Sequence, residues 1–273
     1  SDSGANEVLT YSYSGGNLVG KLTHLKNPTG VCSDAHGNVW VVNAESFKIV
    51  EYAHGGKKAK ATLTDSGTIN PFGCSVDPTT GNLAVANLGN DKVGGSLVVY
   101  AGAQGSGKSY TASSLTHAYF CGYDDSGNLF VDGLDSNSEF VFLELPSGGS
   151  TLQTVSLGGT VNFPGGIAWD GEYLAIGDQE YSGKHSSAID QVTISGSAGT
   201  IEGTTPLTGS CDALQFAISS GGSPRKDGQG NTAIVPDACL NNAAFYDYPA
   251  GGSPTNTITG LTYPVAAAVS LAQ

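Results

Sequence analysis

Acidic and amide side chains recur at one position of this sequence, directly after short apolar segments. They are Asn43, Asn87, Asp132, Asp178 and Asp237, and Asp2 falls at the corresponding place near the first residue. Carboxylate and amide oxygens are the ligands that Ca²⁺ prefers, and they also hydrogen-bond polar small molecules. Asp and Asn at strand ends equally cap turns through their own side chains. The set therefore predicts either a polar ligand site or a series of turn caps. For the metal alternative we name Ca²⁺ as the cofactor and Asp132, Asp178 and Asp237 as its ligands.

Histidines and aromatic residues are expected near the same positions. His24, His117 and His185 are candidate catalytic residues, because imidazole acts as a general base near neutral pH. Tyr119 is the candidate aromatic ligand residue, since a ring beside Asp or Asn stacks on a sugar and its hydroxyl hydrogen-bonds. Five more aromatic residues fall on or near this face: Phe72, Phe120, Phe163, Tyr181 and Tyr263. The alternative is that the histidines are inert loop residues and the aromatic rings fill a channel mouth.

Compact catalytic and metal motifs do not occur in the sequence. There is no G-x-S-x-G, H-E-x-x-H or C-x-x-C, so a serine triad or a compact zinc site has no local support, although distant segments could assemble one. Residues 102–109 read GAQGSGKS and fit the phosphate-binding loop pattern. That loop needs a helix directly after it. The residues that follow have a strand-like composition, so we expect a turn and no nucleotide.

Five cysteines predict disulfide bonds. Cys211 is expected to begin an innermost strand and Cys239 to follow its antiparallel neighbour, which places the two within bonding distance. Cys32 and Cys74 fall on innermost strands of adjacent repeats with a one-residue offset, so they either pair or remain buried thiols. Cys121 shares the register of Cys74 and is expected to be unpaired and buried.

An internal repeat must position all of these residues. Its copies are 28–43 (PTGVCSDAHGNVWVVN), 71–87, 118–132 and 164–178, with a degenerate copy that ends at Asp237. Each copy is an apolar strand that ends in Asp, a turn, and a second apolar strand that ends in Asn or Asp. The Asp residues at 34, 77, 124 and 170 are 43, 47 and 46 residues apart. Two further strands around a glycine turn follow each copy, and a sixth such turn lies at 9–16.

Four-stranded units at a spacing of about 45 residues predict a β-propeller. We expect an all-β chain forming one domain over 1–273, with six four-stranded antiparallel blades and the last blade closed by both termini. Residues 263–272 would be the innermost strand of that blade. Its second strand would lie before Ser1, so we expect that the native chain extends upstream or that this blade lacks one strand.

The copies resemble NHL-type repeats, whose pattern is roughly P-x-G-(apolar)-A-V-D followed by G-N and a second apolar strand. Through them the chain is distantly similar to the gluconolactonase and regucalcin-like propellers. That resemblance implies a catalytic divalent metal held at the starts of the innermost strands. This sequence has Thr29, Phe72, Tyr119, Gly165, Asp212 and Val265 near those starts. Only Asp212 can ligate, so the chain departs from that metal chemistry.

Charge narrows the classes of partner. Lys and Arg number 11 against 24 Asp and Glu, a net charge of −13, and such a surface repels nucleic acid and anionic lipid. No apolar run approaches the roughly 20 residues of a membrane helix. The cysteines and sparse charge favour a bacterial secreted or periplasmic monomer.

Two functions compete. The preferred one is a binding module that recognises a polar small molecule, a glycan or a protein at the channel mouth. The alternative is a lactonase- or esterase-like hydrolase, or a lyase, at the same face. An aromatic-filled mouth would favour the binding module.

Overall fold

The computed structural model describes residues 1–13, 16–66, 69–90, 92–219 and 231–271. Within these ranges the regular structure is strand, apart from two 3₁₀ turns, η1 (Ala44–Ser46) and η2 (Ala101–Ala103). Short runs of Val, Ile, Tyr and Thr between Gly, Asn and Asp explain this, because such side chains pack well on a pleated surface.

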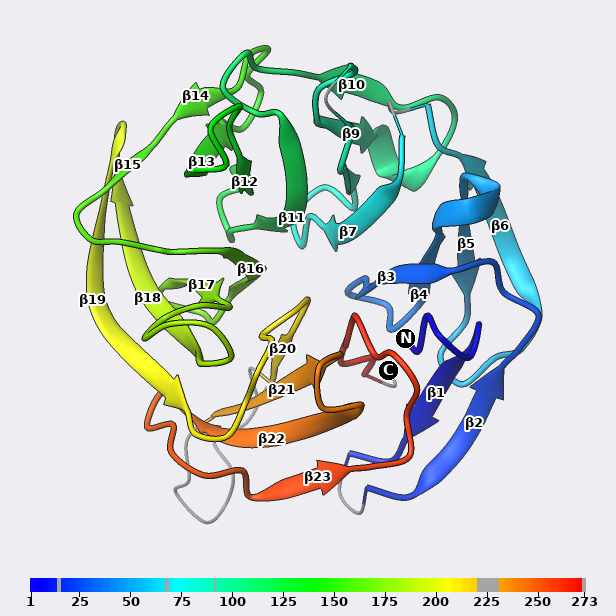
Figure 1. Ribbon diagram of the computed structural model, residues 1–273. Coiled ribbons are helices and arrows are strands. Elements are labelled where there is room, and N and C mark those ends of the chain that lie inside the picture. Colours follow the sequence, from blue (N-terminus) through cyan, green and yellow to red (C-terminus); the bar gives the residue numbers. More distant parts are fainter. Residues whose placement is uncertain (14–15, 67–68, 91, 220–230, 272–273) are drawn as a thin grey trace.

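The sheets follow one another around a central axis as the blades of a propeller (Figure 1). The first blade has β3 (Pro28–Ser33), β4 (Val39–Asn43), β5 (Lys48–Tyr52) and β6 (Ala59–Thr64). The second has β7 (Pro71–Val76), β8 (Leu83–Asn87), β9 (Ser96–Tyr100) and β10 (Lys108–Tyr110). The third has β11 (His117–Tyr123), β12 (Leu129–Leu134), β13 (Phe140–Leu145) and β14 (Gln153–Thr154).

Two further blades complete the set. The fourth has β16 (Pro164–Trp169), β17 (Leu174–Asp178), β18 (Ser187–Ser195) and β19 (Ala198–Leu207), and β15 (Ser156–Leu157) joins it parallel to β19. The fifth has β20 (Ala217–Ser219), β21 (Asn231–Asp237), β22 (Asn242–Tyr248) and β23 (Asn256–Ile258). In every blade the first strand lies nearest the axis. We call the face where the second strands end the ring face, and the opposite one the far face.

The predicted number of six blades is wrong, because the described residues form five. Between the fifth blade and the first lies a two-stranded sheet of β1 (Val8–Tyr11) and β2 (Leu18–Leu22). The segment expected as a sixth innermost strand makes only isolated bridges, such as Asp2 with Pro264. Asp2 also pairs with Glu7, and Gln215 forms the other bridge to this segment, at Ala266. Among the described residues these single bridges do not extend into a ladder along 264–271. The two ends of the chain nevertheless meet here (Figure 1).

The repeated Asp at the end of each innermost strand holds the turn on the far face. Asp34 Oδ1 accepts the backbone N–H groups of His36 and Asn38, at 2.9 and 2.8 Å. The amide of Asn38 donates to the other carboxylate oxygen at 2.8 Å. Asp124 and Asn128 repeat these bonds in the third blade. The Asp and Gly-Asn signature of the repeat is therefore a turn-forming device.

Glycine in the P-x-G start of the innermost strands allows neighbouring blades to touch at the axis. A Cβ on Gly30 would lie 2.2 Å from the carbonyl oxygen of Phe72, in the next blade. A Cβ on Gly73 would lie 2.9 Å from the carbonyl oxygen of Tyr119, one blade further on. Backbone therefore packs on backbone around the central axis, a spacing that no larger residue permits. We call this central region, formed by the innermost strands, the hub.

Apolar side chains fill the spaces between the blades. Trp40 is 3% exposed and packs with Cys32, Cys74, Leu83 and other residues of the first two blades. Trp169 is partly buried against a second such cluster. Both tryptophans therefore belong to the packing between blades, and neither is an exposed platform for a ligand.

Candidate functional site

The acidic residues at the ends of the second strands bind backbone amides of nearby loops. Asp178 accepts N–H groups from Asn162, Phe163 and Glu180, at 2.9, 3.2 and 2.9 Å. Asn162 and Phe163 lie just before β16, and Glu180 lies just after β17, so all three amides flank the two inner strands of the fourth blade. A carboxylate that accepts several N–H bonds is a strong cap for the loops that converge on it.

Asp237 has the same role in the fifth blade. One carboxylate oxygen accepts the Cys211 N–H at 2.7 Å and the Ser210 hydroxyl at 3.0 Å, and the other accepts the Leu240 N–H at 2.9 Å. Asn43 accepts the Lys26 N–H at 3.0 Å. These hydrogen bonds are the ones expected if the residues cap turns. Ligand binding by the same residues stays a prediction.

Asp132 and Asn87 differ from the other members because their side chains are enclosed. Both are fully buried. One Asp132 oxygen accepts the Phe120 N–H at 2.9 Å, while Oδ2 has no partner in hydrogen-bonding geometry among the described residues. Burial raises the pKa of the Asp132 carboxyl well above its ordinary value, against the opposing effect of the amides of Phe120, Asp132 and Gly165. Asp132 is therefore held in a medium that favours its neutral form.

The structure does not bring the three predicted Ca²⁺ ligands together. In the described part of the chain, two groups of His, Cys, Asp and Glu have all their ligand atoms within 4.8 Å of one another, and neither contains Asp132 or Asp178. Asp178 and Asp237 point at amides of separate blades instead. A hard cation needs several oxygens that converge on one point.

Aromatic rings pack together where the hub meets the ring face. Tyr119 lies edge-on to Phe163 and to Phe72, with ring centroids 5.6 and 6.1 Å apart, and Phe72 lies 5.3 Å from Phe120. These residues come from the second, third and fourth blades. Burial raises the pKa of the half-buried Tyr119 phenol. The four rings therefore form one cluster at this end of the innermost strands.

Gln215 closes the hub from the fifth blade, and sequence reasoning missed it. Its side-chain nitrogen donates to the carbonyl of Val31 at 2.7 Å and to that of Cys74 at 3.1 Å. Its backbone N–H donates to Val265 O at 3.2 Å. Gln215 thus ties the inner strands of the first and second blades through its side chain, and residues 265–267 through its backbone. No spacing in the sequence marks this residue.

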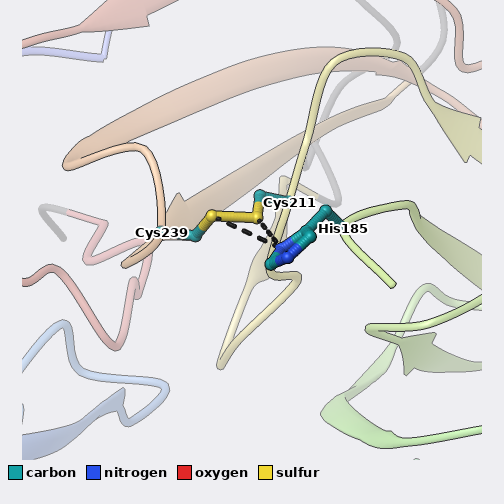
Figure 2. A group of neighbouring side chains, drawn as sticks. All are labelled: His185, Cys211 and Cys239. Carbon is teal, nitrogen blue, oxygen red and sulfur yellow. Dashed lines mark hydrogen bonds between the residues drawn. A yellow bond between two sulfur atoms is a disulfide. The ribbon is translucent and has the colours of Figure 1, made fainter. Parts of the chain in front are cut away.

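The three candidate histidines have different surroundings. His24 is exposed, and its ring nitrogen contacts the Thr23 hydroxyl at 2.9 Å. His117 is half-buried at the start of β11. His185 lies against the Cys211–Cys239 disulfide, with Nδ1 2.8 Å from Cys211 Sγ and 3.8 Å from Cys239 Sγ (Figure 2). Of the three, His185 alone belongs to one of the two close groups of His, Cys, Asp and Glu among the described residues.

Two disulfides are present, in the pairs that the sequence suggested. Cys211–Cys239 and Cys32–Cys74 each have a Cα separation of 5.8 Å, and Cys121 is free and buried. One expectation was wrong: Cys211 does not begin a strand, since β20 starts at Ala217. Residues 211–216 instead leave the blade toward the hub, where Gln215 and Leu214 bond with neighbouring segments. The sequence between these two cysteines also contains an irregular polar insertion, GGSPRKDGQG at 221–230, which lies outside the described residues.

Large apolar side chains are exposed on the loops of the ring face. The nine such residues in the described ranges include five in these loops, each 37–51% exposed: Phe47, Val93, Tyr181, Leu240 and Tyr263. They follow the second strands of four blades or, for Tyr263, precede the terminal segment at the hub. Tyr181 and Tyr263 were expected on this face. The other three are residues that sequence analysis missed, because an apolar loop residue has no period to mark it.

The loop that resembles a phosphate-binding loop is a turn between antiparallel strands, as expected. It contains η2 and leads into β10, and β10 pairs with β9. The Lys108 ammonium lies over the ring of Tyr110, 4.6 Å from its centroid. Without a following helix, the amides and dipole that hold a phosphate are not in place.

Neither a protein-family model nor a curated protein matches this sequence. Solved structures do match. One is from a nidogen/laminin complex, with a TM-score of 0.70 and 16% identity over 100% of this chain and 97% of that one. Others are Kuenenia stuttgartiensis hydrazine synthase (TM-score 0.59, 13% identity, 89% of this chain and 70% of that) and streptogramin B lyase (0.56, 13%, 95% and 75%). At these identities the likeness shows the propeller fold alone. The NHL-type assignment stays a prediction.

Among the described residues, no helix has the length and hydropathy to cross a membrane. The two disulfides are consistent with an oxidising, extracellular environment.

Proposed function

We propose that this chain is a binding module whose ring face docks another protein. The observation that carries the proposal is the set of exposed apolar side chains on the ring-face loops: Phe47, Val93, Tyr181, Leu240 and Tyr263. Exposed apolar residues gathered on one face mark interaction surfaces, whereas scattered ones need no explanation. Loops on a rigid scaffold are also where propellers and similar folds place their sites.

The structure of the hub favours a partner that binds on the surface over a small ligand that enters the channel. Aromatic rings from three blades pack together near the mouth, and the Gln215 side chain bonds to the innermost strands of the first two blades. The oxygens of Asp178 and Asp237, which a polar small molecule or glycan would need, already accept backbone amides. A partner that lies across the loops needs neither an open channel nor free carboxylates.

Two other observations fit a protein partner. One matching structure comes from a complex of nidogen with laminin. The net charge of −13 favours a partner with basic residues around its apolar contact, since complementary charge speeds association. We also propose that the chain is exported, since disulfides persist in oxidising compartments.

A pair of matched variants tests the docking surface. The protein is used to capture partners from extracellular material of its source, and a captured partner is purified and titrated by calorimetry. Tyr181→Ser, Leu240→Ser and Tyr263→Ser together should weaken its binding at least about tenfold, because large buried side chains dominate interface energy. The control is Leu18→Ser with Val19→Ser on β2, which exposes apolar residues away from the ring face. Equal affinities of both variants and the wild type would contradict the proposed surface.

An activity screen tests the enzyme alternative directly. A panel of lactones and esters is assayed with and without EDTA. We expect no turnover above the uncatalysed rate. Turnover that the Tyr181, Leu240 and Tyr263 substitutions leave intact would place the function in the hydrolase class instead.

A further inference from the structure

On the ring face, one histidine and two carboxylates each lie close to the same pair of cysteine sulfurs. His185 comes from the β17–β18 loop of the fourth blade. Cys211 and Asp212 precede β20, and Cys239 follows β21, both in the fifth blade. The ligand atoms of His185, Cys211 and Cys239 (Figure 2) all lie within 4.8 Å of one another. Those of Cys211, Asp212, Asp237 and Cys239 form a second group of the same closeness, which does not include His185.

Asp237 holds this cluster in place. Its carboxylate accepts the amide of Cys211 and the amide of Leu240, the residue after Cys239. One side chain, which is 1% exposed, therefore hydrogen-bonds both loops that contain the cysteines. Asp237 uses its oxygens in these bonds. The other carboxylate near the two sulfurs is that of Asp212, which lies beside the Cys239 backbone amide. Asp212 is only half-buried.

The cluster is accessible from solvent. His185 and Cys239 are exposed, while Cys211 is buried. A reductant can therefore reach the Cys239 sulfur. His185 has a left-handed backbone conformation, with φ of 65°, which is uncommon for a residue with a side chain and is tolerated where surroundings hold it.

We propose that the Cys211–Cys239 disulfide is one of two states of this cluster, and that after reduction the same residues bind one Zn²⁺ ion. His185 Nδ1, Cys211 Sγ and Cys239 Sγ supply three ligands, and Asp212 supplies the fourth. Thiolate, imidazole and carboxylate are the ligands that tetrahedral Zn²⁺ takes. This inference is independent of the protein partner proposed above.

The chemistry balances with a dithiol as reductant. Its two S–H bonds are replaced by one S–S bond, and its two electrons and two protons pass to Cys211 and Cys239. Binding of Zn²⁺ then releases the two thiol protons to solvent, because thiolates are the ligands.

The distances suit the change. Two sulfurs bound to one Zn²⁺ at about 2.3 Å in tetrahedral geometry lie about 3.8 Å apart. The Cα atoms are already 5.8 Å apart, so rotation of the cysteine side chains can separate the sulfurs without moving the backbone. His185 Nδ1 lies 2.8 and 3.8 Å from the two sulfurs, and a tetrahedral site needs about 3.5 Å.

The two states differ in what they join. The disulfide connects two loops of the fifth blade only. Zn²⁺ would also connect the fourth blade through His185. The metal state therefore ties Tyr181 and Leu240, which lie on the same two loops as His185 and Cys239, into one unit.

The test uses the full chain with Cys32→Ser and Cys74→Ser, so that only one pair can be reduced. The protein is reduced with a dithiol, freed of it without oxygen, and titrated with Zn²⁺ by calorimetry and with Co²⁺ by visible absorption. We expect one ion per chain, release of two protons, and the intense visible bands of tetrahedral cobalt–thiolate. His185→Ala should weaken binding at least about tenfold and Cys239→Ser by about a hundredfold or more. His24→Ala, an exposed histidine of another loop, is the matched control.

Three results would overturn the proposal. They are no binding by the reduced chain, equal binding by the oxidised chain, or equal binding by His185→Ala and the His24→Ala control. If reduction unfolds the protein, circular dichroism decides: recovery of strand signal on addition of Zn²⁺ supports the site, and failure to recover it refutes it.

Discussion

Asp132 is a carboxylic acid enclosed by the apolar strands of the third blade, and its ionisation opposes folding. It is fully buried, and burial raises its pKa far above the ordinary value of 3.8. At the equivalent position of the second blade the chain has Asn87, whose amide donates to the carbonyl two residues before it. The fold therefore accepts a neutral side chain at this site.

We expect Asp132→Asn to change how stability depends on pH. In the wild type, the unfolded chain releases the Asp132 proton above about pH 4 while the folded chain keeps it. The native state then binds more protons, so the free energy of unfolding falls as pH rises from the ordinary pKa toward the raised one. The variant lacks this fall. Urea unfolding from pH 4 to 8 measures the difference, and parallel pH profiles would contradict it.

Asp178→Asn is the contrasting substitution, with an effect of opposite sign. Asp178 accepts three backbone N–H groups, two at Oδ1 and one at Oδ2. Replacing either oxygen by an NH₂ group leaves at least one of these N–H groups facing a donor. We expect a loss of about 1.5–3 kcal/mol in the free energy of unfolding at pH 7. An unchanged midpoint in urea would show that the cap is not needed.

The innermost strands are shaped by the closeness of their neighbours. In β3 the Cβ of an alanine at position 30 would meet the backbone oxygen of Phe72 at 2.2 Å, and backbone cannot rotate away. The inner segment of the fifth blade packs against its neighbours at the axis in a different way. There residues 211–216 bend toward the hub, and Gln215 inserts an amide among three segments.

We expect Gly30→Ala to destabilise the protein by about 1–3 kcal/mol or more, as overpacked sites do. Gly94→Ala is the control, because its new Cβ would have its nearest contact at 3.4 Å, with Leu115 O, and its backbone φ is not in the left-handed region. Thermal unfolding of both variants gives the comparison. Equal losses would mean that hub spacing does not explain the P-x-G pattern.

Closure of the propeller depends on links between blades as well as on packing within them. The Cys32–Cys74 disulfide joins β3 to β7 across a blade boundary. Between the fifth and first blades, the described residues contribute β1, β2 and isolated bridges in place of a full blade. Opening at that boundary is resisted by Gln215 and by the segment around Val265.

We expect loss of the Cys32–Cys74 bond, through Cys32→Ser with Cys74→Ser, to lower the free energy of unfolding by up to about 4 kcal/mol. The bond closes a loop with a sequence separation of 42, and a crosslink restricts the unfolded chain. Chemical denaturation measures the loss. Cys121→Ala, which removes a buried sulfur without a bond, should cost less; an equal cost would assign the effect to packing.

Local periodicity determined the parts of this fold that could be predicted. The turn made by Asp34 and Asn38 needs only residues four apart, and the strands beside it need only alternating apolar side chains. The register of Cys32 and Cys74 followed from the same repeat. These features are encoded within one unit of about 45 residues, so the sequence by itself predicts the propeller, its antiparallel blades and the Cys211–Cys239 pair. It left Cys32 and Cys74 either paired or as buried thiols, and the structure decided for the bond.

Only the tertiary structure decided how the units close and what the ring face offers. Blade number depends on whether 264–271 finds a continuous partner strand, and it finds single bridges instead. Gln215 meets Val31 across 184 residues of chain, and His185 meets Cys239 across 54. The exposure of Leu240 and Val93 depends on how the loops of the ring face pack in the folded molecule. Such contacts join segments that share no repeat position, so no period in the sequence carries them.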